Sequence, residues 1–104
     1  MTAIVVFRVR VRADMGEAYA AASQRMEELV REQPGFLDMV GWVDPQTGEE
    51  ITIVQFVDDA AVKAWRDQPE HVEVRRRGHD EFYESFDISV ATSVRHYEWT
   101  RTDA

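Results

Sequence analysis

The chain has 104 residues, of which 44% are hydrophobic and 31% charged, so residues 1–104 have room for one globular domain and not for two. Its net charge of −8 repels nucleic-acid phosphates and anionic lipid headgroups, so we expect neither a nucleic acid nor a membrane as a partner. The absence of cysteine excludes disulfides and thiolate metal sites, and the first residues lack the order of a secretory signal, so we expect a cytoplasmic protein.

The first 35 residues predict a strand followed by a helix. Residues 4–12 alternate between apolar and basic side chains, which is the period of a β-strand with one buried face. Asp14 and Glu17 have the spacing of a capping box, so a helix should begin there. Its apolar stripe recurs at helical spacing and consists of Met15, Tyr19, Ala22, Met26, Leu29 and Val30. Pro34 and Gly35 should end the helix.

A hairpin of two strands is predicted next. Residues 36–43 and 51–57 are rich in β-branched and aromatic side chains, as strands usually are. Residues 44–48 between them contain a proline and a glycine, which suit a turn. Asp58 or Asp59 should then cap a short second helix.

The last third of the chain predicts more helix and then a long strand. Trp65 lies on the short second helix, which Pro69 interrupts. A further helical stretch should run from about residue 70 to 83, with a bend near Gly78. Residues 88–100 predict a final strand whose apolar phase changes midway, as at a bulge or where a strand passes between two partner surfaces.

The predicted order β-α-β-β-α-β indicates an α+β, ferredoxin-like fold. Its helices would cover one face of a four-stranded antiparallel sheet and leave the other face open. That open face would carry Arg8, Arg10 and Arg12 beside apolar side chains. Two copies packed sheet to sheet would bury both faces, so we expect a homodimer built as a dimeric α+β barrel.

Several short segments resemble those of the antibiotic biosynthesis monooxygenase family. They appear in the family's order and spread over nearly the whole chain: 33–36 (QPGF), 60–66 (AAVKAWR), 70–71 (EH), 90–91 (VA) and 94–97 (VRHY). The resemblance implies a dimeric α+β barrel. It also implies, as in some members, quinone-forming oxygenase chemistry that needs no metal or flavin.

Other members of that family degrade heme, and the resemblance is incomplete for them. They use an Asn on the first strand, a Trp on the second helix and a His ten residues after that Trp. Here Trp65 matches the Trp, whereas Phe7 replaces the Asn and Arg75 replaces the His. A guanidinium cannot ligate iron, so we expect no heme chemistry. The quinone-forming members carry a Trp and an Asn on the third strand, where this chain has Phe56 and Thr52.

The candidate site follows from a four-residue spacing. His71, Arg75 and His79 should share one face of a helix. We predict His71 as the catalytic base because its ordinary pKa near 6.5 lies close to working pH, Arg75 as the partner of a developing oxyanion, and Trp65 as the residue that positions the ring. The predicted substrate-binding residues are Phe7, Trp42, Phe56, His79 and Phe82. The expected substrate is a small aromatic or polyketide-like compound.

No cofactor or metal is expected for this chemistry. His71 and His79 would lie roughly 12 Å apart along a helix, which is too far to share one ion. Two alternatives remain open from the sequence: a non-catalytic dimeric domain that binds a hydrophobic small molecule, and isomerase or cyclase chemistry on the same fold. A pocket with His71 and Arg75 pointing into it would favour chemistry, whereas a purely apolar lining would favour binding.

Overall fold

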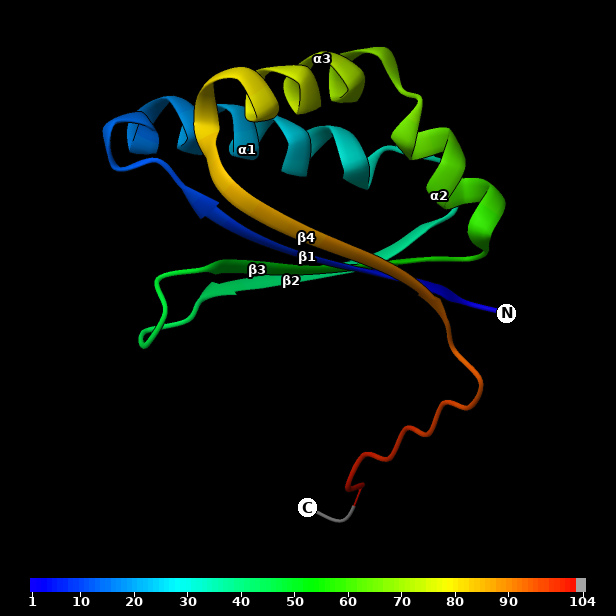
Figure 1. Cartoon of the computed structure of the whole chain (residues 1–104). Helices are drawn as coiled ribbons and strands as arrows, with labels where there is room; N and C mark the ends of the chain where they lie inside the picture. The colour runs from blue at the N-terminus through cyan, green and yellow to red at the C-terminus, as the bar shows by residue number, and fades with distance from the viewer. Residues whose placement is uncertain (103–104) are drawn as a thin grey trace.

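The computed structural model describes residues 1–102, which form one antiparallel sheet of four strands with three α-helices against one of its faces (Figure 1). The strands lie in the order β2-β3-β1-β4. The elements are β1 (Ala3–Val11), the short 3-10 turn η1 (Ala13–Met15), α1 (Gly16–Arg31), β2 (Phe36–Val43), β3 (Glu50–Phe56), α2 (Asp59–Arg66), α3 (Pro69–Arg77), the π turn η2 (Gly78–Phe82) and β4 (Tyr83–Thr92). This order confirms the predicted α+β, ferredoxin-like fold. The pairing of two copies into a barrel stays a prediction.

Alternation along β1 separates the two faces of the sheet, as the sequence predicted. Val5 and Val9 are buried on the helix side, whereas Arg8 and Arg10 are exposed on the other face. The core forms where β1 and β3 meet the helices, because apolar side chains of both layers are brought together there. Its buried members are Val5, Val30, Val54 and Phe56, and the side chains packed against them are Phe36, Met39, Ala61, Val62 and Trp65.

The two predicted helix starts had different outcomes. Asp14 does not cap α1: it lies in the short turn η1, and its carboxylate accepts a hydrogen bond from Arg12 at 3.1 Å. The helix begins two residues later, at Gly16. At α2 the prediction left two aspartates open, and Asp58 is the cap, because its carboxylate accepts a hydrogen bond from the Ala61 N–H at 2.9 Å.

The end of the chain differs from the prediction. The helical stretch expected from about residue 70 to 83, with a bend near Gly78, is present as α3 followed by the π turn that begins at Gly78, and the chain enters β4 at Tyr83. The predicted strand over 88–100 is wrong, because β4 stops at Thr92 and residues 93–102 are irregular and run away from the body (Figure 1). The reason is the partner strand: β1 begins at Ala3, which lies opposite Thr92, and after one more backbone hydrogen bond, from the Ser93 N–H to the Thr2 carbonyl at 2.8 Å, only Met1 is left on that side.

No α-helix within residues 1–102 is both long enough and apolar enough to cross a membrane.

Candidate functional site

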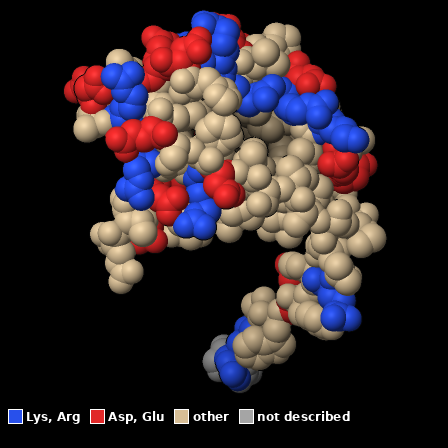
Figure 2. Space-filling view, viewed as in Figure 1, with Lys and Arg blue, Asp and Glu red and all other residues tan. Residues whose placement is uncertain are grey.

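An exposed apolar strip on β4 forms the floor of the candidate site. Phe86, Ile88 and Val90 lie opposite β1 residues that face the helices, so they too are on the helix side of the sheet. They nevertheless remain 43%, 54% and 51% exposed, because no helix covers this edge of the sheet. Between the helices and β4, the space-filling view shows an uncharged, hollowed surface (Figure 2). A row of basic side chains lies above it. Such a surface suits a flat apolar ring.

The junction of α2 and α3 places Trp65 and His71 against each other. Their rings are stacked with centroids 3.9 Å apart and planes 11° apart. The Nδ1 atom of His71 lies 2.8 Å from the backbone carbonyl oxygen of Trp65. A carbonyl oxygen only accepts, so Nδ1 carries the proton and Nε2 offers a lone pair. The Gln68 side chain caps α3 by accepting from the His71 backbone N–H at 2.9 Å, which fixes the residue further.

The environment of His71 makes its imidazole a weak base. Burial lowers the pKa of His71 to about 4, the hydrogen bond to the Trp65 carbonyl opposes this change, and the positive charge of Arg75 lowers the pKa further. The pKa near 6.5 that we expected for His71 is therefore wrong, because the imidazole is largely buried. At neutral pH the site holds a neutral imidazole that accepts hydrogen bonds through Nε2.

Arg75 brings a positive charge to the rim of the site. Its Nη2 donates a hydrogen bond of 2.8 Å to the backbone carbonyl of Arg66, at the end of α2. Its charge acts on His71 and also on Tyr83, whose pKa is raised by burial and lowered in part by Arg75. The guanidinium therefore lies within electrostatic reach of both the imidazole and the phenol.

Phe7 and His79 meet in a second aromatic group beside β4. The ring of Phe7 contacts Tyr83 and Phe86 with centroid distances of 6.0 and 6.2 Å. The imidazole of His79 meets the ring of Phe86 edge-on, at 5.0 Å. Sequence reasoning missed Tyr83 and Phe86, because it extended the helix over Tyr83 and began the last strand after Phe86. Alternation from Tyr83 onwards was not visible, since a register shift interrupts the start of β4.

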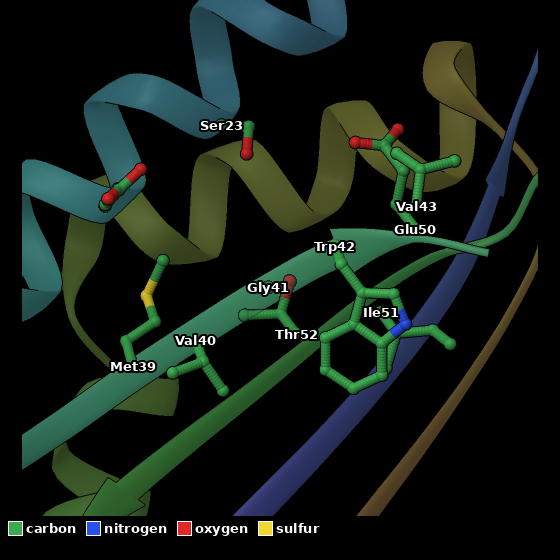
Figure 3. A pocket seen from close by; sticks show the side chains of 10 residues that line it. Ser23, Met39, Val40, Gly41, Trp42, Val43, Glu50, Ile51 and Thr52 are labelled. Carbon is green, nitrogen blue, oxygen red and sulfur yellow. The ribbon is translucent and has the colours of Figure 1, made fainter. Parts of the chain in front are cut away.

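Trp42 is not part of this group, so its predicted place among the substrate-binding residues is corrected. It lies opposite Ile51 on the uncovered face of the sheet, half exposed. In Figure 3 Trp42 points away from the helices, whereas Met39 points towards them. The cause is a bulge after Phe36, which reverses the alternation of β2 and puts Trp42 on the face opposite to Phe36.

Phe56 and Phe82 are also corrected as substrate contacts. Both are 0% exposed, so neither offers surface to a ligand. Phe56 belongs to the core cluster, and Phe82 packs under the ring of Tyr19 at 5.9 Å. Both side chains therefore contribute to the packed interior and not to the surface of the site.

Two open hollows lie elsewhere on the surface. One, of about 290 Å³, lies between α1 and the β2–β3 hairpin and is lined in part by Ser23, Glu50 and Thr52 (Figure 3). It lies next to the candidate site on the same face of the sheet, because Thr52 on β3 is paired with Phe7 on β1. The other, of about 470 Å³, lies between α1 and α3 and has small apolar residues at its base. Neither of the two is lined by Trp65 or His71.

The described residues do not match the heme site of the heme-degrading relatives. Phe7, at the position of their Asn, has no polar atom, and Arg75, at the position of their His, is a guanidinium bonded to a carbonyl. Within residues 1–102 no group of three or more His, Asp or Glu side chains gathers to hold a metal ion.

Comparison with known proteins agrees with this fold. The family model "Antibiotic biosynthesis monooxygenase" matches residues 2–77. The uncharacterized protein YqjZ of Bacillus subtilis (strain 168) is 32% identical over 89 residues, which are 86% of this chain and 75% of that protein. Rv0793 from Mycobacterium tuberculosis superposes with a TM-score of 0.84 at 16% identity, covering 94% of this chain and 100% of that one.

SnoaB, a cofactor-independent oxygenase from Streptomyces nogalater, superposes with a TM-score of 0.76 at 16% identity, covering 91% of this chain and 95% of that one. At such identity these two structures show a shared fold. The family model covers well over half of the sequence, and the segments that carry the resemblance include the stacked Trp65 and His71. This chain belongs to the antibiotic biosynthesis monooxygenase family.

Proposed function

We propose that this protein is a cofactor-independent monooxygenase that oxidises a small aromatic or polyketide-like phenol. The observation that carries the proposal is that the charge of Arg75 acts both on His71, which is stacked on Trp65, and on Tyr83, which packs on Phe86 of the exposed apolar strip of β4. A flat ring would lie on the apolar floor, and its hydroxyl would reach the few polar groups at the rim. Phe7 and His79 would contact the ring from the side of β1 and β4.

Arg75 supplies the electrostatic part of the reaction. A positive charge beside the substrate hydroxyl favours the phenolate over the phenol. The electron-rich phenolate reacts with O2 to form a carbon–oxygen bond and, after protonation, a hydroperoxide, which loses water to give the quinone. One phenol and one O2 thus become one quinone and one water, with no external reductant. The guanidinium stabilises the negative charge that develops on oxygen.

His71 orients the substrate through Nε2. With a pKa of about 4 it is a poor acceptor of a whole proton. Transfer from an ordinary phenol with a pKa near 10 would cost about 8 kcal/mol, at about 1.4 kcal/mol per pKa unit. A hydrogen bond from the phenol to Nε2 requires no proton transfer and therefore avoids this free-energy cost. Arg75 lowers the pKa of the substrate at the same time. His71 and Arg75 are therefore proposed to act together.

The low basicity of His71 also favours a second candidate, a domain that binds a phenol without oxidising it. The same floor and the same hydrogen bond would serve both functions. One measurement distinguishes the oxygenase from the binding domain: whether O2 is consumed when the phenol is bound.

Two substitutions of His71 separate the hydrogen bond donated to the Trp65 carbonyl from the acceptor at the position of Nε2. His71→Asn keeps an N–H that can donate to the Trp65 carbonyl but lacks the acceptor at the position of Nε2. His71→Gln reaches further and can place an amide oxygen near that position. O2 uptake and quinone absorbance are measured with 1-naphthol, dihydroxynaphthalenes and anthrone.

We expect His71→Asn to lose activity by about tenfold, the loss typical of one hydrogen bond that orients the substrate, and His71→Gln to lose less. His96→Asn is the matched control, because His96 is exposed on the C-terminal segment and should keep the wild-type rate. A His71→Asn protein with an unchanged rate would remove His71 from the mechanism. Phenols that bind but consume no O2 would leave the binding domain as the function.

A further inference from the structure

We infer that Tyr83 is a second ligand-binding group of this site, and that Gly78 and the π turn make room for its hydroxyl beside the apolar strip of β4. The site would then prefer a ring system with two separated oxygen substituents, one bound near His71 and the other at Tyr83. The inference deepens the proposed function. It rests on that function only for the oxidation of the bound ligand, and not for the binding itself.

The ring of Tyr83 is fixed by three aromatic neighbours from three different elements. Its centroid lies 6.0 Å from that of Phe7 on β1, 6.0 Å from that of Tyr19 on α1 and 5.6 Å from that of Phe86 on β4. Edge-to-face and tilted contacts of this kind are favourable and directional. Phe7 and Phe86 belong to the candidate site, so the phenol ring of Tyr83 borders the same apolar floor.

Gly78 makes room for the hydroxyl end of that ring. A Cβ atom at Gly78 would lie 2.3, 2.4 and 2.7 Å from the Cε2, Cζ and Oη atoms of Tyr83, which are impossible contacts. The backbone of Gly78 is ordinary helix, with φ of −57°, so glycine is needed here for space and not for conformation. The Tyr83 backbone N–H closes the π turn by donating to the Gly78 carbonyl. Single π turns inside helices are frequent at functional sites.

The hydroxyl of Tyr83 has no partner among residues 1–102. Burial and the charge of Arg75 act on this hydroxyl, and no hydrogen bond from a described residue does. Within the same residues no side-chain oxygen or nitrogen is sealed from solvent without a partner, so this hydroxyl is accessible. Burial raises the pKa of Tyr83, so the hydroxyl is protonated at neutral pH and can donate. Arg75 is within electrostatic reach of it.

Packing alone does not account for a tyrosine at this position. A phenylalanine would fill the same space without bringing a half-buried hydroxyl that the protein leaves unpaired. The glycine and the wide turn accommodate that hydroxyl end in particular. A ligand oxygen that accepts from Tyr83 would complete the arrangement, while a second hydroxyl of the ligand donates to Nε2 of His71.

The test measures binding under argon, where no oxidation can occur, by calorimetric titration of 1-naphthol and of 1,5-, 1,6- and 2,6-dihydroxynaphthalene. We expect the wild type to bind at least one of the dihydroxy compounds more tightly than 1-naphthol. Tyr83→Phe should weaken the tightest dihydroxy compound about tenfold, the loss typical of one hydrogen bond, and leave 1-naphthol and the melting temperature unchanged. Tyr19→Phe is the matched control, since it removes a hydroxyl from the ring on α1 that packs against Tyr83, and it should bind as the wild type does.

A second variant tests the role of Gly78. Gly78→Ala should displace the Tyr83 ring and weaken all of these ligands, if it folds; Tyr83→Phe decides the question even if it does not. Unchanged affinities in Tyr83→Phe would overturn the inference, and so would a wild type that binds none of the compounds. Selective loss in Tyr83→Phe, with no O2 uptake by the wild type in air, would uphold the inference and reject the proposed oxygenase.

Discussion

His71 is held in one tautomer by the carbonyl of a residue six positions before it. The four-residue spacing in the sequence placed His71 and Arg75 on one side of a helix, and both lie at the candidate site. Spacing carries no information on burial, which is what lowers the pKa of His71 here. It also could not show the stacking on Trp65, which depends on the short break between α2 and α3. The residues were therefore predictable, but their protonation was not.

The depressed pKa of His71 predicts a specific loss of stability in acid. In the unfolded chain this histidine binds a proton below its ordinary pKa of 6.5, whereas in the folded chain it does so only below about 4. Between these values the unfolded state binds more protons, so the free energy of unfolding falls as the pH falls. From pH 7 to pH 4.5 the contribution of this one group is a loss of about 2 kcal/mol, at about 1.4 kcal/mol per unit.

Urea unfolding of the wild type and of His71→Gln at the two pH values measures this effect. The glutamine does not titrate, and all carboxylates are common to both proteins, so the difference between their pH dependences isolates His71. We expect the wild type to lose about 2 kcal/mol more than the variant. Equal losses in the two proteins would mean that the folded imidazole titrates near its ordinary pKa.

At the scale of the elements, two self-contained local signals were read correctly, whereas a third, the capping box at Asp14, was not. The strand alternation of β1 and the Pro34–Gly35 stop needed no distant partner, and Gly35 indeed has a positive φ of 85°. The face of Trp42 and the end of β4 depended on other strands: a bulge after Phe36 reversed the first, and the start of β1 limited the second. Register is a property of a pair of strands, so one strand's sequence does not determine it.

The start of α2 provides a matched pair for measuring a cap. The Asp58 carboxylate accepts from the Ala61 N–H, whereas Asp59 lies inside the first turn and forms an ion pair with exposed Lys63. Asp58→Ala should lower the free energy of unfolding by about 1 kcal/mol, because it leaves a helix N–H without its acceptor. Asp59→Ala removes the same charge from the same helix end and should cost less, since an exposed ion pair contributes little. Urea unfolding of both variants checks this, and equal losses would show that charge, not the cap, is what matters.

Besides the strip on β4, the described residues expose apolar side chains on the open sheet face and along residues 93–102. On the open sheet face Trp42 and Val40 are half exposed, while the nearby charge of Arg8 is already paired with Glu49 at 2.7 Å. Residues 93–102 leave the domain with large exposed side chains, and the radius of gyration is 15.1 Å, against about 13 Å for a compact chain of this size. We propose that a second copy covers the open face, as in the barrel that the family resemblance implies.

Light scattering on the purified protein at micromolar concentration should therefore give about twice the chain mass of 12.1 kDa. Trp42→Glu should shift the mass towards one chain, because it would bury a carboxylate between two sheets, while its circular dichroism stays that of the wild type. Val72→Glu is the control: Val72 is also exposed, but on α3 in the helical layer, so its charge should leave the dimer intact. A monomeric wild type would reject the barrel. A dimer that Val72→Glu dissociates and Trp42→Glu does not would move the interface to the helices, because the only difference between the two proteins is the face that carries the new charge.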